Sequence, residues 1–180
     1  MAYIGLRKPF IASMKEDGKY EAVKQFARAI QLDITPNYAE GSLYCDDAVG
    51  EEDKIFNYAD ITLGTDTIPL DFRVTLFGNK TTEEEVVFNI DDIAPNVGMG
   101  IIKIEKVKGV KKYVAAVFPK CKFTEPSESV NTKGESITYN TPSIAGKAFA
   151  NDSGDWKLTK VFTTEAEAIA YIKEKLPATV

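Results

Sequence analysis

Residues 55–63 read IFNYADITL, and this stretch decides the class of fold. Its apolar side chains recur with a period of two, which indicates a β-strand. The two faces of the strand are Ile55, Ala59, Ile61 and Leu63 on one side, and Phe56, Tyr58, Asp60 and Thr62 on the other. Because both faces carry large apolar side chains, we expect the strand to be covered on two sides, as in a sandwich or a closed barrel.

A second stretch, residues 111–118, repeats the two-sided pattern. Tyr113 and Val117 face one way, and Val114 and Phe118 face the other. This strand is expected to be the return strand of a hairpin over 101–118, with its turn at Gly109. Similar alternation predicts further strands at 26–35, 85–90, 119–124, 135–149 and 157–162, with a polar loop at 124–134.

Two segments predict helices. Thr164 and Glu167 form a capping box, in which a hydroxyl and a carboxylate satisfy each other's backbone donors, so a helix begins after Thr164. Pro177 ends this helix, which should lie outside a sheet. Its expected apolar face is Ala166, Ile169, Ile172 and Leu176. The second segment runs from Pro69 to Gly78, residues that suit a helix start and a helix end, although its mixed apolar pattern leaves a strand open.

The chain shows no internal repeat and no linker. We therefore expect one domain over residues 1–180, mainly β, with two packed antiparallel sheets (a sandwich or open barrel) and one or two peripheral helices. The least regular piece is residues 36–54, PNYAEGSLYCDDAVGEEDK, whose periodicity is weak. We expect a long surface loop there with one short strand, and long ordered loops are usually functional or make contacts elsewhere.

Composition excludes several classes of protein. The net charge of the 180-residue chain is -5, which argues against general nucleic-acid binding, since that needs a basic surface. No segment approaches the ~20 apolar residues of a membrane helix, and the first residues lack the apolar core of a signal peptide. Cys45 and Cys121 are isolated, so we expect reduced thiols and synthesis in the cytoplasm.

The sequence contains few residue patterns that are typical of a catalytic site. The chain has no histidine, which removes the commonest general base and metal ligand, and it has no phosphate-binding glycine motif. Carboxylate pairs at 46–47, 83–85 and 91–92 lie in stretches that read as loops or turns, where acids are usually solvated. Asp152 to Asp155 lacks the spacing of a calcium loop. We therefore expect no enzyme activity, no cofactor and no bound metal.

One basic cluster stands out on the expected hairpin. It consists of Lys103, Lys106, Lys108, Lys111 and Lys112. Such a cluster suits contact with nucleic acid, but lysine is also a common device that keeps an exposed strand edge from pairing. We favour the second interpretation.

Motifs distributed along nearly the whole chain carry a resemblance. They are IGL at 4–6, EGSLY at 40–44 followed by Asp46 and Asp47, ITLG at 61–64 with IPL at 68–70, AP at 94–95 with VGMG at 97–100, FPKCKF at 118–123 with EPS at 125–127, TKGESI at 132–137, TP at 141–142, Trp156, and FTTEA at 162–166. None of them is specific alone. In this order and spacing, the chain resembles the major tail protein (tail tube protein) family of long-tailed bacteriophages, in the branch typical of Gram-positive hosts.

The resemblance implies a fold and a role. Family members have two packed antiparallel sheets with an outer helix, and six copies form a ring whose sheets join into one barrel. Rings stack into a hollow tube through which DNA passes without specific binding. The implied protein is a non-catalytic virion component of the tail, made in the host cytoplasm. Its implied partners are further copies of itself and other tail proteins such as the tape measure and the terminator, and no membrane.

Residues can be assigned to these roles as expectations. A lumen used by DNA should be polar and not basic, because a basic wall would hold the phosphates. The polar faces expected there are Gln31, Asp33 and Thr35, and Ser136, Thr138 and Asn140. We expect segment 36–54 and the hairpin tip to contact neighbouring subunits, because both extend away from the core and neither carries a catalytic site that would explain this. The interface residues are Leu43, Tyr44, Asp46, Asp47, Lys108 and Gly109.

Two other classes of protein stay open. The first is a β-sandwich module of the virion that binds a receptor or carbohydrate, which predicts an exposed aromatic cluster on a cleft or on one face. The second is a carboxylate-dependent hydrolase, which predicts two carboxyl groups at ~5–10 Å in a groove.

Overall fold

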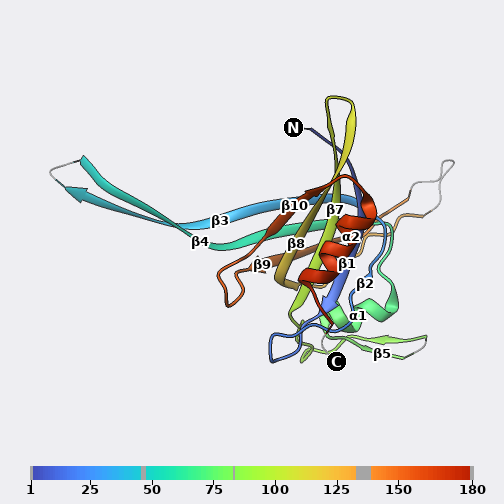
Figure 1. The fold of residues 1–180 in the computed structure, drawn as a ribbon. Helices are drawn as coiled ribbons and strands as arrows, with labels where there is room; N and C mark the ends of the chain where they lie inside the picture. The colour runs from blue at the N-terminus through green and yellow to red at the C-terminus, as the bar shows by residue number, and fades with distance from the viewer. Residues whose placement is uncertain (1, 46–47, 83, 133–138, 179–180) are drawn as a thin grey trace.

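The computed structural model describes the backbone of residues 2–45, 48–82, 84–132 and 139–178, and their side chains except those of 42–52. The chain forms ten strands and two helices over these ranges (Figure 1). In order they are β1 (Ala2–Ser13), β2 (Lys24–Gln25), β3 (Ala29–Cys45), β4 (Ala48–Thr65), α1 (Leu70–Phe77), β5 (Lys80–Thr81), β6 (Val86–Val87), β7 (Val97–Val107), β8 (Val110–Phe123), β9 (Ser143–Phe149), β10 (Leu158–Phe162) and α2 (Glu165–Lys175).

One large antiparallel sheet dominates the fold. Its strand order is β2-β1-β7-β8-β9-β4-β3, and β10 pairs with the first half of β8. Strands β5 and β6 form a second, two-stranded sheet. The prediction of a mainly β fold with two sheets and two helices is confirmed.

The core has two parts, one on each face of β7 and β8. On one face, the side chains of α2 cover Ile102 and Val117. On the other face, Met99 and Phe118 join a larger cluster that contains Ile11 of β1 and Ile61 of β4. Because β1 and β4 lie near opposite ends of the strand order, the sheet curls around this cluster.

Strand β8 has the two-sided burial predicted for residues 111–118. Val117 packs under α2 and Phe118 packs into the larger cluster. The partner register slips by one residue between Val97↔Cys121 and Met99↔Phe118, so β8 bulges at Pro119 and Lys120. Residues 119–124, expected as a separate strand, therefore continue β8. The hairpin expected at 101–118 lies within β7 and β8, which pair up to Val107↔Val110.

The prediction for residues 55–63 is partly wrong. The strand forms within β4, but only the face with Ala59, Ile61 and Leu63 is buried. Asn57 is an extra residue between the pairs Asn37↔Tyr58 and Tyr38↔Phe56. This bulge reverses the alternation, so Phe56 packs against the core and Ile55 is 69% exposed. The other face stays open to solvent because no layer of the described chain lies over it.

Helix α2 begins as the capping box predicts. Thr164 accepts a hydrogen bond from the Glu167 backbone N–H, and the Glu167 side chain accepts one from the Thr164 backbone. The expected apolar face is shifted: Ala168, Ile172 and Leu176 are buried, whereas Ala166 is exposed. The helix lies very close to β7, because a Cβ atom added at Gly100 would overlap the Ile172 side chain.

The segment 69–78 is helical, as favoured, and forms α1. Pro69 is its N-cap, and Gly78 ends it in the left-handed conformation with φ 77°. Of the other expected strands, β6 is only Val86–Val87, and β9 begins at Ser143. Among the described residues no helix is long and apolar enough to span a membrane.

Candidate functional site

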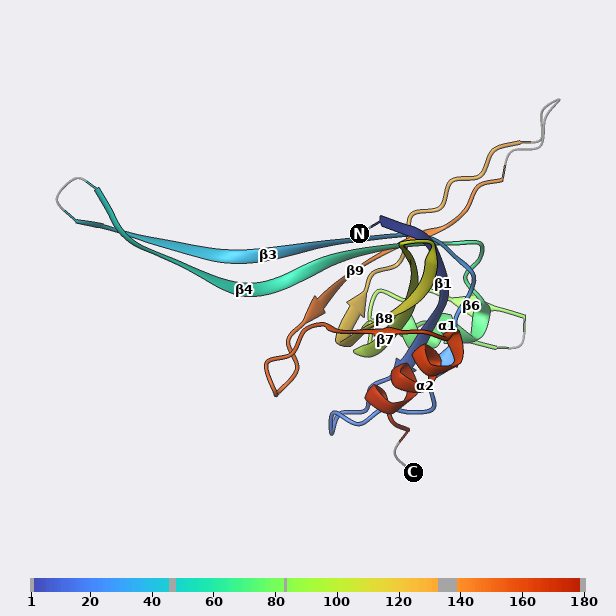
Figure 2. The same ribbon diagram turned by 45° about the horizontal axis from the view of Figure 1, so that its top comes forward.

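The most distinctive feature is a β-ribbon that leaves the body. The described parts of residues 36–54, expected as a loop, instead belong to β3 and β4, which pair from Ala29↔Thr65 to Cys45↔Ala48. For these residues the expectation of a loop is therefore wrong. One reason is that most of the described side chains of this segment are exposed, so no buried face imposes a period on the sequence. Figures 1 and 2 show this ribbon, called the arm below, extending far from the rest of the molecule.

The arm consists of the described parts of residues 37–58. Strand β9 supports β4 only from Ala59 to Gly64, so beyond Ala59 the ribbon has no third strand among the described residues. Two-stranded ribbons are marginally stable in water without a third strand or a packed face. Tyr38 is 51% exposed and Ile55 is 69% exposed on the arm. The arm is therefore built in a way that favours contact with another molecule.

The outer edge of β3 is also open. Strand β3 ends the strand order, and none of the described strands pairs with its outer edge along its 17 residues. Backbone N–H and C=O groups on such an edge are a template for another strand. Pro36 lies in this strand opposite Ala59, where the proline ring removes one donor.

One face of the outer strands is polar. Gln31, Asp33 and Thr35 of β3, which the sequence assigns to a lumen as an expectation, are exposed and lie on the same face. Gln31 Nε2 donates to Asp33 Oδ2 at 2.6 Å. Asn37 continues the row and donates from Nδ2 to Asp60 Oδ2 of β4 at 2.7 Å. These bonds hold the acidic side chains within a continuous polar surface.

One of the cations on this polar face contacts an aromatic ring. Lys147 of β9 lies opposite Asp60, and its Nζ is 3.9 Å from the centre of the Tyr58 ring. Asp33 and Asp60 are the acids of the face. Lys122 of β8 lies directly opposite Lys147 and is exposed, so the described face is polar and carries charges of both signs.

An aromatic group lies where the arm joins the body. Phe56 stacks on Trp156 with ring centres 4.7 Å apart, and Tyr38 meets Phe56 edge-on at 6.0 Å. Trp156 also contacts Phe118 of the core. Lys157 lies beside the Trp156 ring, and burial lowers the pKa of this lysine. The group links the arm to the core through rigid side chains.

The β7–β8 hairpin projects from the end of the body that also holds the start of β1 (Figure 1). Its turn is Lys108-Gly109, with φ 48° and 83°. A non-glycine residue in this left-handed region costs about 1–2 kcal/mol. Lys106 and Lys111 lie directly opposite each other, and like charges so placed also destabilise a hairpin. The hairpin tip therefore carries lysines at positions that oppose its own stability.

The edge-protection interpretation favoured from the sequence fits only part of this cluster. Lys111 and Lys112 precede the start of the β8–β10 pairing at Tyr113, so none of the described strands covers their outer edge. Strand β7 is interior, because β1 pairs with it as far as Ala2↔Lys106. Lys106 therefore does not protect a strand edge, and Lys108 lies in the turn. Local folding gives no reason for lysine at either position.

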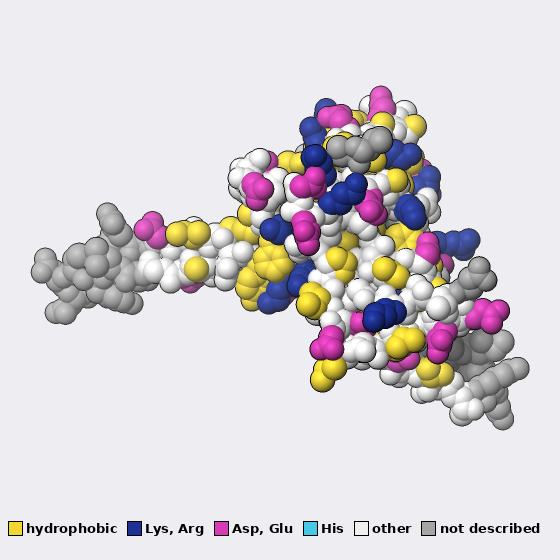
Figure 3. Space-filling view, turned by 90° about the horizontal axis from the view of Figure 1, so that it is seen from below, with side chains coloured by type: hydrophobic (Ala, Val, Ile, Leu, Met, Phe, Trp, Pro, Cys, Tyr) yellow, Lys and Arg dark blue, Asp and Glu magenta, His cyan; other side chains and the backbone are white. Residues whose placement is uncertain are grey.

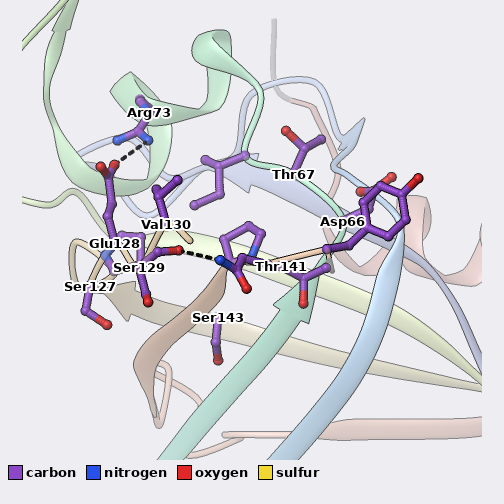
Figure 4. Close-up of a pocket in the computed structure, with 14 residues that line it drawn as sticks. Asp66, Thr67, Arg73, Ser127, Glu128, Ser129, Val130, Thr141 and Ser143 are labelled. Carbon is purple, nitrogen blue, oxygen red and sulfur yellow. Dashed lines mark hydrogen bonds and ion pairs between the residues drawn. The ribbon is translucent and has the colours of Figure 1, made fainter. Parts of the chain in front are cut away.

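A shallow cleft of about 700 Å³ lies beside α1 (Figure 4). Arg73 of α1 is largely buried there, with Nη1 2.7 Å from Glu125 Oε1 and Nη2 3.6 Å from Glu128 Oε1. Burial raises the pKa of Glu125, and the positive charge of Arg73 acts in the opposite direction. Asn140, an expected lumen residue, donates instead to the Ser129 carbonyl at 3.2 Å on this cleft. The ionic groups of Arg73, Glu125 and Glu128 thus pair with one another.

Asp92 and Cys121 lie outside this cleft, and each has a structural environment of its own. Asp92 accepts hydrogen bonds from the Asn89 backbone and from Asn79, and the first of these lowers the pKa of Asp92 most. Cys121 is a free, fully buried thiol, and burial raises the pKa of this group far above its ordinary value. The described residues contain no cluster of three or more Cys, Asp and Glu that could hold a metal ion.

The structure places only part of the expected site. Gln31, Asp33 and Thr35 lie together on the polar face, and Lys108 and Gly109 form the hairpin tip. Leu43 and Tyr44 belong to β3 in the arm, although their side chains lie outside the described residues. Asp46, Asp47, Ser136 and Thr138 also lie outside the described residues, as does the Cys45 side chain. Sequence reasoning missed Asn37, whose period-two spacing from Thr35 could have placed it on the same face.

Fold and site together define a mainly β protein with an exposed arm, an open sheet edge and a polar sheet face. No protein-family model matches the chain. No curated protein matches it either. Among solved structures, it is similar to the cap that terminates the tube of the anti-feeding prophage, determined by cryo-EM. The two are 14% identical, the match covers 90% of this chain and 93% of the other, and the TM-score is 0.42, a likeness too distant to assign a function.

Proposed function

We propose that the chain is a non-catalytic structural subunit of a phage tail tube, which forms hexameric rings that stack into a hollow conduit for DNA in the virion tail. The observation that carries the proposal is the arm. This two-stranded ribbon extends from the body, and none of the described strands pairs with it as a third strand. The open edge of β3 adds a template for strand pairing. The resemblance of the ordered sequence motifs to tail tube proteins is the reason for proposing hexameric rings and a stacked tube in particular.

The polar face gives the conduit its expected wall. When sheets of neighbouring copies join edge to edge, one face of each strand lines the lumen. The face with Gln31, Asp33 and Thr35 has hydrogen-bonded acids and two adjacent lysines, Lys147 over the Tyr58 ring and Lys122 opposite it. In this proposal the neighbouring acids weaken the hold of these lysines on DNA phosphates. In this proposal the other tail proteins contact the ends of the tube and its interior.

The test removes the arm without disturbing the body. Residues 40–54 are replaced by Asn-Gly, a two-residue turn that joins the paired residues Ala39 and Ile55. We expect the variant to fold, because the deleted ribbon packs against no third strand of the described chain, and to remain monomeric. The wild type should form rings and tubes by negative-stain microscopy at rising concentration. A matched control replaces the exposed turn residues Asp152 and Ser153 by alanine and should assemble like the wild type.

Two results would overturn the proposal. One is a wild-type chain that stays monomeric at all concentrations by light scattering. The other is an arm-deleted variant that assembles as well as the wild type.

The aromatic group at the base of the arm favours a second candidate, a receptor- or carbohydrate-binding virion module. Tyr38 is half-exposed beside Phe56 and Trp156. However, the Phe56 and Trp156 rings already stack on each other, which leaves fewer free ring faces for a sugar. A glycan-dependent rise in melting temperature together with a persistent monomer would support this candidate over the tube.

A further inference from the structure

Strand β7 connects two ends of the body that differ in charge. It starts at Val97 near α1, β5 and β6, and it ends at the β7–β8 tip (Figure 1). We call residues 103–112 the basic tip and residues 84–93 the acidic end. The basic tip holds five lysines and one acid, Glu105, which is buried. The acidic end holds four acids and no lysine or arginine.

The lysines of the basic tip destabilise the hairpin that carries them. Lys106 faces Lys111 across the hairpin, and Lys108 adopts a positive φ that favours glycine or asparagine. The three side chains are exposed, and no acidic side chain is bonded to them among the described residues. Next to them, Val110 is 61% exposed. Charges that oppose the fold of their own chain indicate a partner that compensates them.

The acidic end exposes both acidic and large apolar side chains. Glu84, Glu85 and Asp91 are exposed, while Ile90 and Ile93 are 98% and 76% exposed. Figure 3, which views the molecule from below, shows acidic and hydrophobic side chains on this side of the body, with some basic side chains among them. The cations nearest in sequence are Lys80 and Arg73.

Arg73 is paired with Glu125 and Glu128 and lies 5.5 Å from the centre of the Phe88 ring. Lys80 lies opposite Val87 and offsets one acid of this end, which leaves an excess of acids. The acidic end thus complements the basic tip in charge, and both carry exposed apolar side chains, as interfaces between proteins commonly do.

We propose that the basic tip docks on the acidic end of a second copy, so that charge sets a head-to-tail order. The occupant is a second copy because the chain itself carries the complementary surface at its opposite end. A net charge of -5 makes a polyanion a poorer partner for the molecule as a whole. This contact rests on the proposed function, in which it joins one ring to the next.

The experiment reverses each end and then mixes the two variants. The tip variant is K106E/K108E/K111E, which keeps like charges opposite each other in the hairpin. The end variant is E84K/E85K/D91K, which reverses three exposed acids. A control, K15E/K24E/K173E, makes the same change in net charge as the tip variant at exposed lysines away from the tip. All are examined by negative-stain microscopy and light scattering, with circular dichroism to verify folding.

Each reversal alone should place like charges together between stacked copies. We expect rings without tubes, or tubes only at a protein concentration at least about tenfold higher than for the wild type. An equimolar mixture of the two variants should restore tubes, since each variant then meets the opposite charge. The control should form tubes like the wild type, and high salt should weaken wild-type stacking.

The outcomes separate the two proposals. Tubes from both single-end variants at the wild-type concentration would overturn this inference and leave the tube function standing. The inference also fails if the mixture forms no tubes while both variants are folded, or if the basic tip binds duplex DNA in preference to a second copy. A wild-type chain that forms neither rings nor tubes refutes the proposed function itself.

Discussion

The contact between α2 and β7 makes a quantitative prediction. In Gly100→Ala the new methyl group would overlap Ile172 Cγ2 and lie 3.2 Å from Ile172 Cγ1. Overpacking a core in this way costs about 1–3 kcal/mol. Ile172→Ala alone removes a fully buried side chain and costs about 2–5 kcal/mol, part of which is the cavity that it leaves.

The double variant should be less destabilised than the sum of the two. With Ile172 shortened, the methyl group introduced at position 100 fills part of the cavity, and replacing glycine in a strand gains about 0.5–1 kcal/mol from the unfolded state. We therefore expect a coupling free energy of about 1–3 kcal/mol between the two sites.

The assay is urea unfolding followed by the fluorescence of Trp156, the only tryptophan. Gly41→Ala is the control, because a Cβ at Gly41 meets nothing within 4 Å, and it should stay within about 0.5 kcal/mol of the wild type. Equal costs of Gly100→Ala in both backgrounds would refute the described approach of α2 to β7.

Three other measurements test the described contacts. Phe56→Ala should lower the free energy of unfolding by about 2–3 kcal/mol, while Ile55→Ala should change it by less than about 0.5 kcal/mol; equal losses would place the bulge elsewhere. Hydrogen bonds from Thr164 lower the pKa of Glu167, so its stabilising effect is complete above the ordinary value of 4.5 and is lost as the pH falls below it. The melting temperatures of wild type and Glu167→Gln should thus converge from about pH 6 to about pH 3, and a constant difference would contradict this. In a Cys45→Ser background, a thiol reagent should modify Cys121 at least about a hundredfold more slowly in the folded than in the unfolded chain, and similar rates would show that Cys121 is accessible.

The sequence predicts best what local rules control. The capping box of Thr164 and Glu167 marks the start of α2, because its bonds join residues only three apart. Residues 111–118 reveal a strand buried on both faces, because each face carries its own apolar side chains. Gly109 identifies the hairpin turn, since few residues adopt its positive φ.

The arm could not be predicted in the same way. Period-two reasoning needs one face to be buried, and among the described side chains the arm packs against the body only at its base, through Phe56. Two bulges add to the difficulty. Asn57 is an extra residue opposite Asn37 and Tyr38, and Gly50 is one opposite Leu43 and Tyr44. After each bulge, the odd-numbered and even-numbered side chains exchange faces. One face of the strand therefore has no constant period of two in the sequence.

The polar face was predictable only within one strand. Gln31, Asp33 and Thr35 share a face because their spacing is two residues. The bond from Asn37 to Asp60 depends on the register of β3 against β4, which joins residues 23 apart. That register is determined by the whole hairpin and not by a short motif.

Pro36 divides the open edge of β3 into two unequal stretches. Proline is tolerated in an edge strand when its missing N–H faces away from the sheet, so the outer edge lacks a donor at this position. A single long strand added to β3 would lose a hydrogen bond in its middle. Two shorter segments, one along residues 29–35 beside the body and one along 37–45 on the arm, would lose none. The edge is therefore better suited to two short added strands than to one long strand.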